Sequence, residues 1–295
     1  MNALNYLEEE SISIIRDTLR KSNNPLILYS IGKDSTVLLH LFKKALYPLK
    51  NNIRVLHVDT KWKFKEMIEY RDRFFKSEKI NFMIYTNNRG IYENITPFNN
   101  PRYTDIMKTD ALKQVLNDNK FDFVYGGARR DEEVSRSKER ILSIRNKYNN
   151  WDPVNQRIEP WNMFNTNISK EESFRVFPLS NWTEVNIWEY IKKEKLDVVP
   201  LYFAKKRKVV VRNNQIFLLD DDRFKLEKGD EVENLIVRFR TLGCYPLTQG
   251  VLSNANTVDK IIKELKDSSY SERAGRLIDY EKEGMMELRK KEGYF

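Results

Sequence analysis

The chain has 295 residues, which at about 150 residues per domain predicts about two domains, and its 52 basic and 43 acidic side chains give a formal net charge of +9. One cysteine and two histidines exclude an intramolecular disulfide, a cysteine-based zinc site and an iron–sulfur cluster, and they disfavour a Ser–His–Asp triad. No apolar run approaches the ~20 residues that span a bilayer and the N-terminus lacks the pattern of a secretory signal, so we expect a soluble, cytoplasmic protein without a membrane partner.

Helix and strand patterns alternate through the first 127 residues. Apolar residues at helical spacing predict helices, and short apolar runs predict buried strands. One of these helices is expected to begin at Thr104, whose hydroxyl suits an N-cap. Because strands alternate with helices, we predict an α/β fold with a doubly wound, mostly parallel sheet. The expected helices cover about 4–21, 35–46, 64–79 and 104–119, and the expected strands cover 25–30, 53–59, 80–86 and 121–127.

The second half of the chain has a different texture. Residues 128–175 are charged and weakly periodic, which is typical of a binding segment rather than an idle loop. We predict a nucleotide-binding α/β catalytic domain over 1–199 and a smaller, mixed α+β region over 200–295 that docks a partner and closes the active site. The elements expected after residue 173 are a strand at 174–180, a helix capped by Thr183, a hairpin at 208–219 turning at Asn213–Asn214, a strand at 233–243 and a helix at 257–268.

A polar loop with one glycine separates the first expected strand from its helix, and it reads SIGKDST over residues 30–36. In an open α/β sheet, ligands bind beyond the carboxyl ends of the strands. Gly32 lets the backbone approach an anion, the first amides of the helix point toward it, and Lys33 adds a full positive charge. The sequence therefore predicts a phosphate-binding loop, although the GxxxxGK[ST] pattern of a Walker A loop is absent.

Two further strand ends are expected to face the same crevice. Asp59 closes the second strand, Gly126 and Gly127 close the fourth, and Arg129 and Arg130 come directly after them. The glycines permit close backbone approach, and a planar guanidinium offers two hydrogen bonds to a tetrahedral oxyanion. The alternative interpretation is the start of a surface helix laced with salt bridges.

The surplus of positive charge has two interpretations. The dense run Lys205–Lys208 could belong to a basic RNA-binding module, which needs its cations clustered on one face. Heavy use of lysine and asparagine at surface positions explains the same surplus without a partner. Arg240, in the segment FRTLGCYPLT, is a further cation, and the same segment contains two expected turn residues.

The loop at 30–35 resembles the PP-loop, S-x-G-x-D-S, of the N-type ATP pyrophosphatases, which cleave ATP between the α- and β-phosphates. Other motifs are similar, in order and over essentially the whole chain, to the family of small catalytic subunits of heteromeric bacterial sulfate adenylyltransferase. Lys61, Gln249–Gly250 and Leu252 depart from that family's pattern, and Lys61, where we expect glycine, borders the expected nucleotide crevice. The matching motifs include SIGKDS, HVDT-x-WKF, TDIMKT, GGARRDEE-x-SR-x-KER, RVFPLSNWTE, RFRTLGCYPLT, SERAGRLID and KKEGYF.

The resemblance implies that ATP and sulfate give adenosine 5′-phosphosulfate and pyrophosphate, the first step of sulfate activation for cysteine biosynthesis. It also implies a partner, a GTPase large subunit that drives this uphill reaction by GTP hydrolysis in a heterodimer or larger assembly. Because the chain has no Walker A loop, that GTPase must be another polypeptide. We expect Mg²⁺ with the ATP, no organic cofactor and no nucleic acid.

These expectations assign roles to individual residues. Lys33, Arg129 and Arg130 are the candidate catalytic residues, because sulfate needs positioning and charge stabilisation rather than a general base. Asp34, with Asp59 as the alternative, is the candidate magnesium ligand. The candidates for ATP are Ser30, Gly32, Lys33, Asp34, Ser35, Asp59, Gly126 and Gly127, and those for sulfate are Arg129, Arg130 and Arg240.

Two rival functions compete with this one. A phosphoadenylyl-sulfate reductase shares the PP-loop but needs a nucleophilic cysteine near the C-terminus, whereas Cys244 lies in LGCYP. An RNA-binding module with a vestigial nucleotide pocket would bind RNA in a salt-dependent way without exchanging ATP and pyrophosphate. His57 either contacts ribose or adenine or is a satisfied residue at a strand end, and His40 and Cys244 are expected to be structural.

Overall fold

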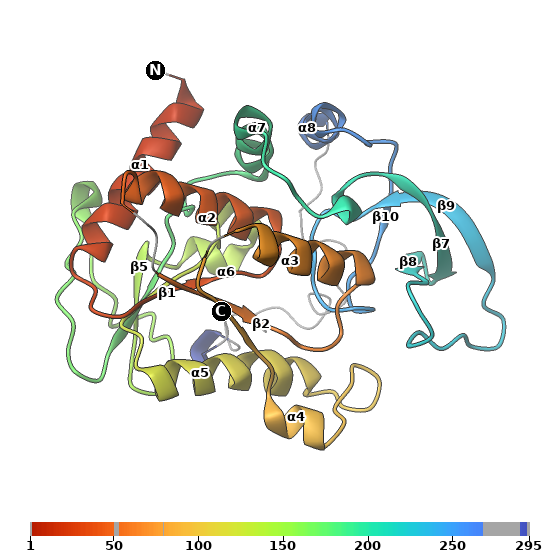
Figure 1. Ribbon diagram of the computed structural model, residues 1–295, viewed down its shortest axis with the longest axis horizontal. Coiled ribbons are helices and arrows are strands. Elements are labelled where there is room, and N and C mark those ends of the chain that lie inside the picture. The colour runs from red at the N-terminus through yellow and green to blue at the C-terminus, as the bar shows by residue number, and fades with distance from the viewer. Residues whose placement is uncertain (1, 50–52, 79, 268–289, 294–295) are drawn as a thin grey trace.

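The computed structural model describes residues 2–49, 53–78, 80–267 and 290–293 (Figure 1). The motif SERAGRLID, at 271–279, lies outside these residues. Among the described helices, none combines the length and the apolar character that crossing a bilayer requires.

A six-stranded sheet forms the centre of the fold, with the order β3-β2-β1-β4-β6-β5. Neighbouring strands are parallel except at the edge, where β5 runs antiparallel to β6. The strand order changes direction between β1 and β4, and a crevice opens at the carboxyl ends of the strands on either side of such a point. The prediction of a mostly parallel α/β sheet is confirmed. The strands are β1 Pro25–Leu28, β2 Arg54–Val58, β3 Phe82–Tyr85, β4 Phe123–Tyr125, β5 Leu142–Arg145 and β6 Ser173–Val176.

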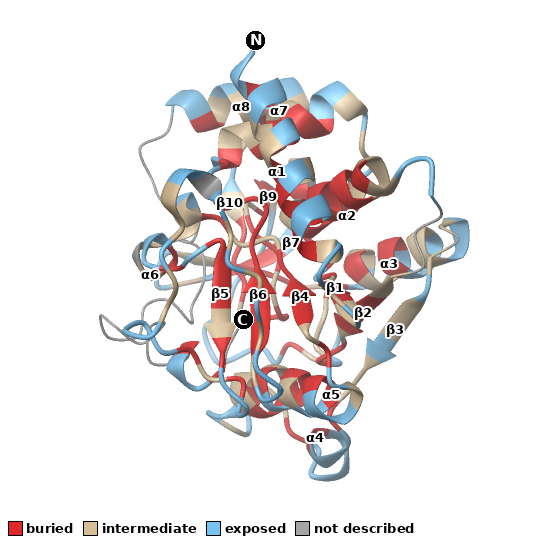
Figure 2. Cartoon of the chain, turned by 90° about the vertical axis from the view of Figure 1, so that its left-hand side faces the viewer, coloured by how far each residue is buried: buried red, intermediate tan, exposed pale blue. Residues whose placement is uncertain are grey.

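Helices cover both faces of this sheet, as the red-to-orange helices on one side and α5 on the other show (Figure 1). Because side chains alternate along a strand, Ile27 and Val55 pack under the helices of one face while Leu26 and Leu56 pack against Leu112 on the other. The strands β4, β5 and β6 are accordingly largely buried in Figure 2. The helices are α1 Ala3–Leu19, α2 Lys33–Leu46, α3 Lys65–Ser77, α4 Asn88–Tyr92, α5 Ala111–Asn119, α6 Val134–Ser137, α7 Glu184–Glu194 and α8 Val258–Asp267.

Two local predictions differ from the structure. Thr104 is no N-cap: it has helical dihedral angles (φ −64°, ψ −40°), its side chain caps no amide, and the Ile106 amide already donates to the Arg102 carbonyl. The helix therefore begins earlier and continues as a π-helix over Asp105–Asp110 before α5. The segment 128–175 is not wholly irregular, because it contains β5, an edge strand of four residues that is too short for its alternation to be recognised.

A second, antiparallel sheet with the order β10-β9-β7-β8 follows residue 200. Its hairpin turns at Asn213 and Asn214, whose φ angles of 48° and 62° match the predicted two-residue turn. One buried apolar cluster extends from the first sheet to the second, and the Phe64 and Phe239 rings meet within it at 4.9 Å. The strands are β7 Lys205–Arg212, β8 Gln215–Leu218, β9 Val232–Arg238 and β10 Val251–Leu252.

Candidate active site

The loop between β1 and α2 has the conformation that a phosphate site needs. Gly32 is the N-cap residue, and α2 begins at Lys33 with its first amides directed beyond the carboxyl end of β1. The Ser35 hydroxyl donates to the Gly32 carbonyl at 2.9 Å and lies 3.2 Å from the Ser30 hydroxyl. Ile31 is buried and has a φ of 69°, which is a strained conformation for a β-branched residue. Tertiary packing therefore holds this loop in shape.

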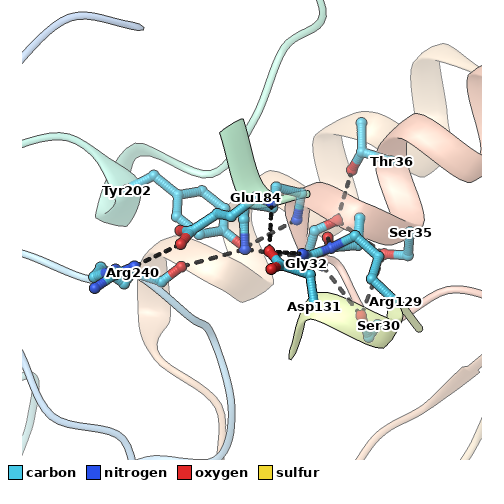
Figure 3. A network of polar contacts seen from close by, with 11 residues as sticks. Ser30, Gly32, Ser35, Thr36, Arg129, Asp131, Glu184, Tyr202 and Arg240 are labelled. Atoms are coloured by element: carbon cyan, nitrogen blue, oxygen red, sulfur yellow. Dashed lines mark hydrogen bonds and ion pairs between the residues drawn. The ribbon is translucent and has the colours of Figure 1, made fainter. Parts of the chain in front are cut away.

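Lys33 is a buried cation at the start of α2. Its ammonium group lies 3.3 Å from the Asp34 carboxylate and 3.5 Å from the Arg240 carbonyl oxygen. Its backbone amide donates to the Tyr202 hydroxyl at 2.9 Å, and its ammonium group lies 5.9 Å from the centre of that ring. Residues from the C-terminal region thus contact the phosphate loop directly (Figure 3).

Arg129 connects the loop to the segment that follows β4. Its side chain is fully buried, its Nε donates to Asp34 Oδ1 at 2.7 Å, and its Nη1 lies 3.4 Å from Asp131 Oδ2. Gly127 fits tightly beside this pair, because a Cβ atom there would lie 3.0 Å from the backbone carbon of Asp34. The glycine turn and the phosphate loop are therefore packed as one unit.

The same network reaches the helix α7 and the C-terminal region. Asp131 accepts from the Glu184 amide at 3.1 Å, at the start of α7, where a carboxylate is favourable. The Glu184 carboxylate pairs with Arg240 at 2.6 Å. Because the Arg240 carbonyl in turn contacts Lys33, the contacts form the ring drawn in Figure 3. Four segments that are distant in sequence are fixed relative to one another.

A cavity opens beside this network at the carboxyl ends of β1, β2 and β4. Apolar side chains form part of its wall, as a site for a nucleobase requires. Its charged lining includes, among the described residues, four cations against two carboxylates, so its electrostatic character favours anions. The predicted residues on the wall are Ser30, Gly32, Lys33, Asp34, Ser35, Gly126, Gly127 and His57; the additional charged ones are Lys63, Lys108, Arg136 and Glu132.

Several predicted site residues lie outside the cavity lining. Asp59 is buried and pairs with Arg71 at 3.1 Å. Arg130 donates to the Asn181 side chain at 2.6 Å, and Arg240 is held by Glu184 as described above. Arg129 contacts the loop aspartate instead of the cavity. The structure therefore brings the loop residues and glycines together but directs the three predicted arginines into ion pairs or surface contacts.

The cavity wall also contains residues to which the sequence assigned another role or none. Cys244 is buried on the wall, 3.3 Å from the Thr60 hydroxyl. Lys108 reaches the wall from the π-helix, an element that often marks functional sites but has no sequence signature. Lys63 belongs to the motif HVDT-x-WKF and Arg136 to the motif GGARRDEE-x-SR-x-KER. Their place in these motifs was the sequence signal that could have identified them as site residues. His40 lies elsewhere, 3.3 Å from the Glu194 carboxylate, which fits the structural role predicted for it.

Comparison with known proteins identifies the family. The domain family described as "Phosphoadenosine phosphosulfate reductase domain" matches residues 24–250. Over its full length, the chain is 52% identical to the "Sulfate adenylyltransferase subunit 2" of Trichlorobacter lovleyi, covering 100% of this chain and 99% of that protein. The protein of the same name from Saccharophagus degradans is 54% identical over 99% of this chain and 97% of its own length. The chain belongs to the sulfate adenylyltransferase subunit 2 family.

Membership of this family confirms the predicted class of enzyme, a nucleotidyltransferase, and disfavours the reductase and RNA-binding alternatives. A solved structure of Candida glabrata FMN adenylyltransferase, in complex with FMN and an ATP analogue, is similar with a TM-score of 0.53. It is 15% identical and covers 92% of this chain and 90% of its own. This likeness concerns the fold, and it confirms the predicted architecture.

Proposed function

We propose that the chain transfers the adenylyl group of ATP to sulfate, giving adenosine 5′-phosphosulfate and pyrophosphate. A sulfate oxygen attacks the α-phosphorus, the bond from that phosphorus to the oxygen bridging to the β-phosphate breaks, and pyrophosphate leaves with the electron pair. Sulfate is already a dianion at neutral pH, so no general base is needed. The observation that supports this reaction is a phosphate loop opening onto a cation-rich cavity, in a chain of this family.

The phosphate loop supplies most of the electrostatic stabilisation in this proposal. The amides at the start of α2 and the hydroxyl groups of Ser30 and Ser35 bind the β- and γ-phosphates, and Lys33 neutralises the charge that develops on the leaving pyrophosphate. Gly126 and Gly127 allow the nucleotide to approach the backbone. A bound phosphate oxygen competes with the Tyr202 hydroxyl for the Lys33 amide.

Sulfate and the α-phosphate need cations on the opposite part of the wall. Lys63, Lys108 and Arg136 line the cavity, and we assign to them the negative charge of sulfate and of the phosphate groups that extend toward them from the loop. Arg129 acts on the reaction by holding Asp34 in the loop. The predicted sulfate contacts of Arg130 and Arg240 require these side chains to leave Asn181 and Glu184, and they stay a prediction.

The carboxylates do not fit a magnesium ion held by the protein. Asp34 faces the cavity, but its two oxygens contact Arg129 and Lys33, and Asp59 pairs with Arg71 outside the lining. Among the described residues no group of three histidine, cysteine or acidic side chains has the spacing of a metal site. Mg²⁺ therefore belongs to the proposal only as part of the MgATP substrate, bound mainly by phosphate oxygens and water.

The curated relatives are named as one subunit of their enzyme, and we propose a GTPase large subunit as the partner here. GTP hydrolysis on that partner drives formation of the phosphosulfate anhydride, which supplies cysteine biosynthesis. Residues 200–295 are the proposed docking and closing region. Tyr202 and the cavity-lining residues 241–244, 247 and 248 support the closing role.

The second sheet offers a surface for such a partner. The strand register pairs Lys206 with Ile236, Lys208 with Asn234 and Val210 with Val232, so these side chains lie on one side of the sheet, where Val210 is buried. Lys206, Lys208, Val232 and Ile236 are exposed, whereas Arg207 turns inward to Glu66. Arg207 thus separates from the other three residues of the basic run, which are exposed, and Lys206 and Lys208 share a face with apolar side chains. That face suits a partner surface with acidic and apolar groups.

The deciding experiment measures pyrophosphate release from ATP with and without sulfate. The full chain is assayed alone and co-purified with its large subunit and GTP, with Lys33→Met as the inactive control. We expect sulfate-dependent release that GTP increases, and a loss of about 100-fold or more in the variant. If the rate of pyrophosphate release does not depend on sulfate under either condition, the proposed adenylyl transfer is overturned. Sulfate-dependent release that ignores GTP would overturn only the coupling.

A further inference from the structure

A buried carboxylate behind the cavity wall links the wall to the C-terminal residues. Glu139 Oε1 accepts from Arg145 Nη2 at 2.5 Å, and Glu139 Oε2 lies 3.2 Å from both Arg136 Nη1 and Lys290 Nζ. Burial raises the pKa of Glu139, but Arg145, Arg136 and Lys290 outweigh it and lower the pKa to about 2. Glu139 is therefore ionised, and one of its oxygens bridges an arginine and a lysine from distant parts of the chain.

Arg136 is the described member of this cluster that lines the cavity. Besides its contact with Glu139, its Nε lies 3.7 Å from the Glu133 carboxylate, and its guanidinium group lies 6.0 Å from the centre of the Phe177 ring. A planar guanidinium held on several sides has a fixed orientation. The direction in which Arg136 presents its charge to the cavity thus depends on Glu139.

Lys290 reaches the cluster from the other end of the chain, in the turn 290–293. Its side chain is fully buried, and its ammonium group lies 5.4 Å from the centre of the Trp151 ring. Gly293, with a φ of 95°, donates its amide to the Lys290 carbonyl, and a Cβ atom there would lie 3.1 Å from the Asn149 carbonyl oxygen. The fit is close, so these residues dock at one defined place.

Among the described residues, several buried cations gather around the Glu139 carboxylate. Arg136, Arg145 and Lys290 surround Glu139, and the fully buried Arg175 adds a fourth cation close enough to Arg145 to interact electrostatically. A polyanion in the cavity beside Arg136 binds better when the guanidinium group is already held in place, because less ordering is left to the binding step. Because coupling between two binding events is reciprocal, the same polyanion then strengthens the docking of Lys290.

We propose that Lys290 is a positioning residue, which fixes Arg136 on the cavity wall through Glu139 and couples the docking of residues 290–293 to the binding of a polyanion. The proposal rests on the proposed function only for the choice of polyanion, inorganic pyrophosphate or the ATP analogue AMPCPP. It needs no turnover of sulfate, so its failure and a failure of the adenylyl transfer are distinguishable.

The test uses the full chain, with pyrophosphate and AMPCPP binding measured by calorimetry and the C-terminal peptide followed by hydrogen exchange. We expect either ligand to increase protection of residues 290–293. Lys290→Met should weaken binding of both about fivefold or more and abolish the ligand-linked protection, and Lys290→Arg should restore both. Lys291→Met removes the same charge from an exposed neighbour and serves as the matched control.

Glu139→Gln provides a second, independent break in the link, since it leaves Lys290 in place. It should also weaken pyrophosphate binding, and in the complete enzyme both variants should raise the KM for ATP. A merely structural role would instead lower Tm and the active fraction, with KM unchanged. The proposal would be overturned if Lys290→Met bound pyrophosphate with wild-type affinity. It would also be overturned if pyrophosphate left the hydrogen exchange of residues 290–293 in the wild type unchanged. The wild-type exchange decides the matter even if a variant fails to fold.

Discussion

Arg129 and Asp34 form a salt bridge of 2.7 Å in which the arginine side chain is fully buried. Asp34 belongs to the phosphate loop, whereas Arg129 follows the glycine turn after β4. The arginine therefore contacts the loop on the side away from the cavity, and its side chain does not line the cavity. The motifs SIGKDS and GGARRDEE, separated by about ninety residues, function as one structural unit.

Replacing Arg129 by lysine keeps the charge but removes the forked geometry. One ammonium group cannot make both the Nε contact to Asp34 and the Nη1 contact to Asp131. Losing a hydrogen bond to a charged group costs about 1.5–3 kcal/mol, so we expect kcat/KM for ATP to fall roughly 10- to 100-fold. The assay is sulfate-dependent pyrophosphate release, with the exposed Arg73→Lys as the control. Wild-type turnover in Arg129→Lys would contradict the positioning role.

The sequence predicted the sheet, its helices and the phosphate loop because each of these is encoded locally. Periodicity identified the strands β1 to β4, and the polar loop at Gly32 stands directly between a strand and a helix. The Asn213–Asn214 turn and the Thr183 cap, whose hydroxyl accepts from the Asn186 amide at 3.2 Å, are likewise short-range features. Local patterns of this kind survive folding unchanged, so they can be recognised before the structure is known.

The parts that escaped prediction depend on contacts between distant segments. Arg129 was expected on an anion, but its direction is set by Asp34, ninety-five positions away in sequence. Lys108 lines the cavity because a π-helix turns it there, and Arg136 because Glu139 holds it. Cations that look alike in sequence thus differ in position according to which carboxylate each one contacts, and composition alone cannot distinguish them.

Gly127→Ala tests the tight packing of the glycine turn on the loop. The added Cβ atom would lie 3.0 Å from the backbone carbon of Asp34, which cannot move as freely as a side chain. We expect the phosphate loop to shift and pyrophosphate affinity to fall about tenfold, while far-UV circular dichroism shows an intact fold. Gly250→Ala is the matched control, because its nearest neighbour, Val237 Cβ, would lie at an ordinary 3.6 Å. Equal affinities in the two variants would contradict the prediction.

Lys61 stands where the family resemblance leads us to expect glycine, and its φ angle of 62° explains that expectation. The left-handed region costs a non-glycine residue about 1–2 kcal/mol, and glycine's larger unfolded-state entropy costs about 0.5–1 kcal/mol. Lys61→Gly should therefore leave Tm within about 3 °C of the wild type, whereas Lys61→Val should lower it by several degrees.

Activity offers an independent check on Lys61. Its side chain is largely exposed and does not line the cavity, and its ion pair with Asp59, at 3.8 Å, is weak at that exposure. The KM for ATP in Lys61→Gly should match the wild-type value. A raised KM would show that this departure from the family pattern serves nucleotide binding.

His57 makes the stability of the fold depend on pH. Its Nδ1 donates to the Tyr29 carbonyl at 2.8 Å, so Nε2 carries no proton in the neutral ring. Burial and then the charge of Lys63 lower the pKa of His57 to about 4. In the unfolded chain a histidine titrates near 6.5. Between about pH 6.5 and 4 the unfolded state therefore binds a proton at His57, whereas the folded state does not. Stability is therefore lost as the pH falls from about 6.5 to 4.

The size of this effect can be measured with His57→Asn, which keeps an amide donor for Tyr29 but does not titrate. A difference of about 2.5 units between the two pKa values corresponds to about 3 kcal/mol at pH 4. We expect the free energy of unfolding in urea to fall more steeply in the wild type than in the variant, by about 1.4 kcal/mol per pH unit below 6.5. Carboxylates other than Asp59, whose pKa is itself lowered in part by the charge of His57, contribute alike to both curves, so they cancel in the difference. Parallel curves would mean that the folded protein protonates His57 freely, and that its ring adds positive charge to the cavity wall instead of a neutral acceptor.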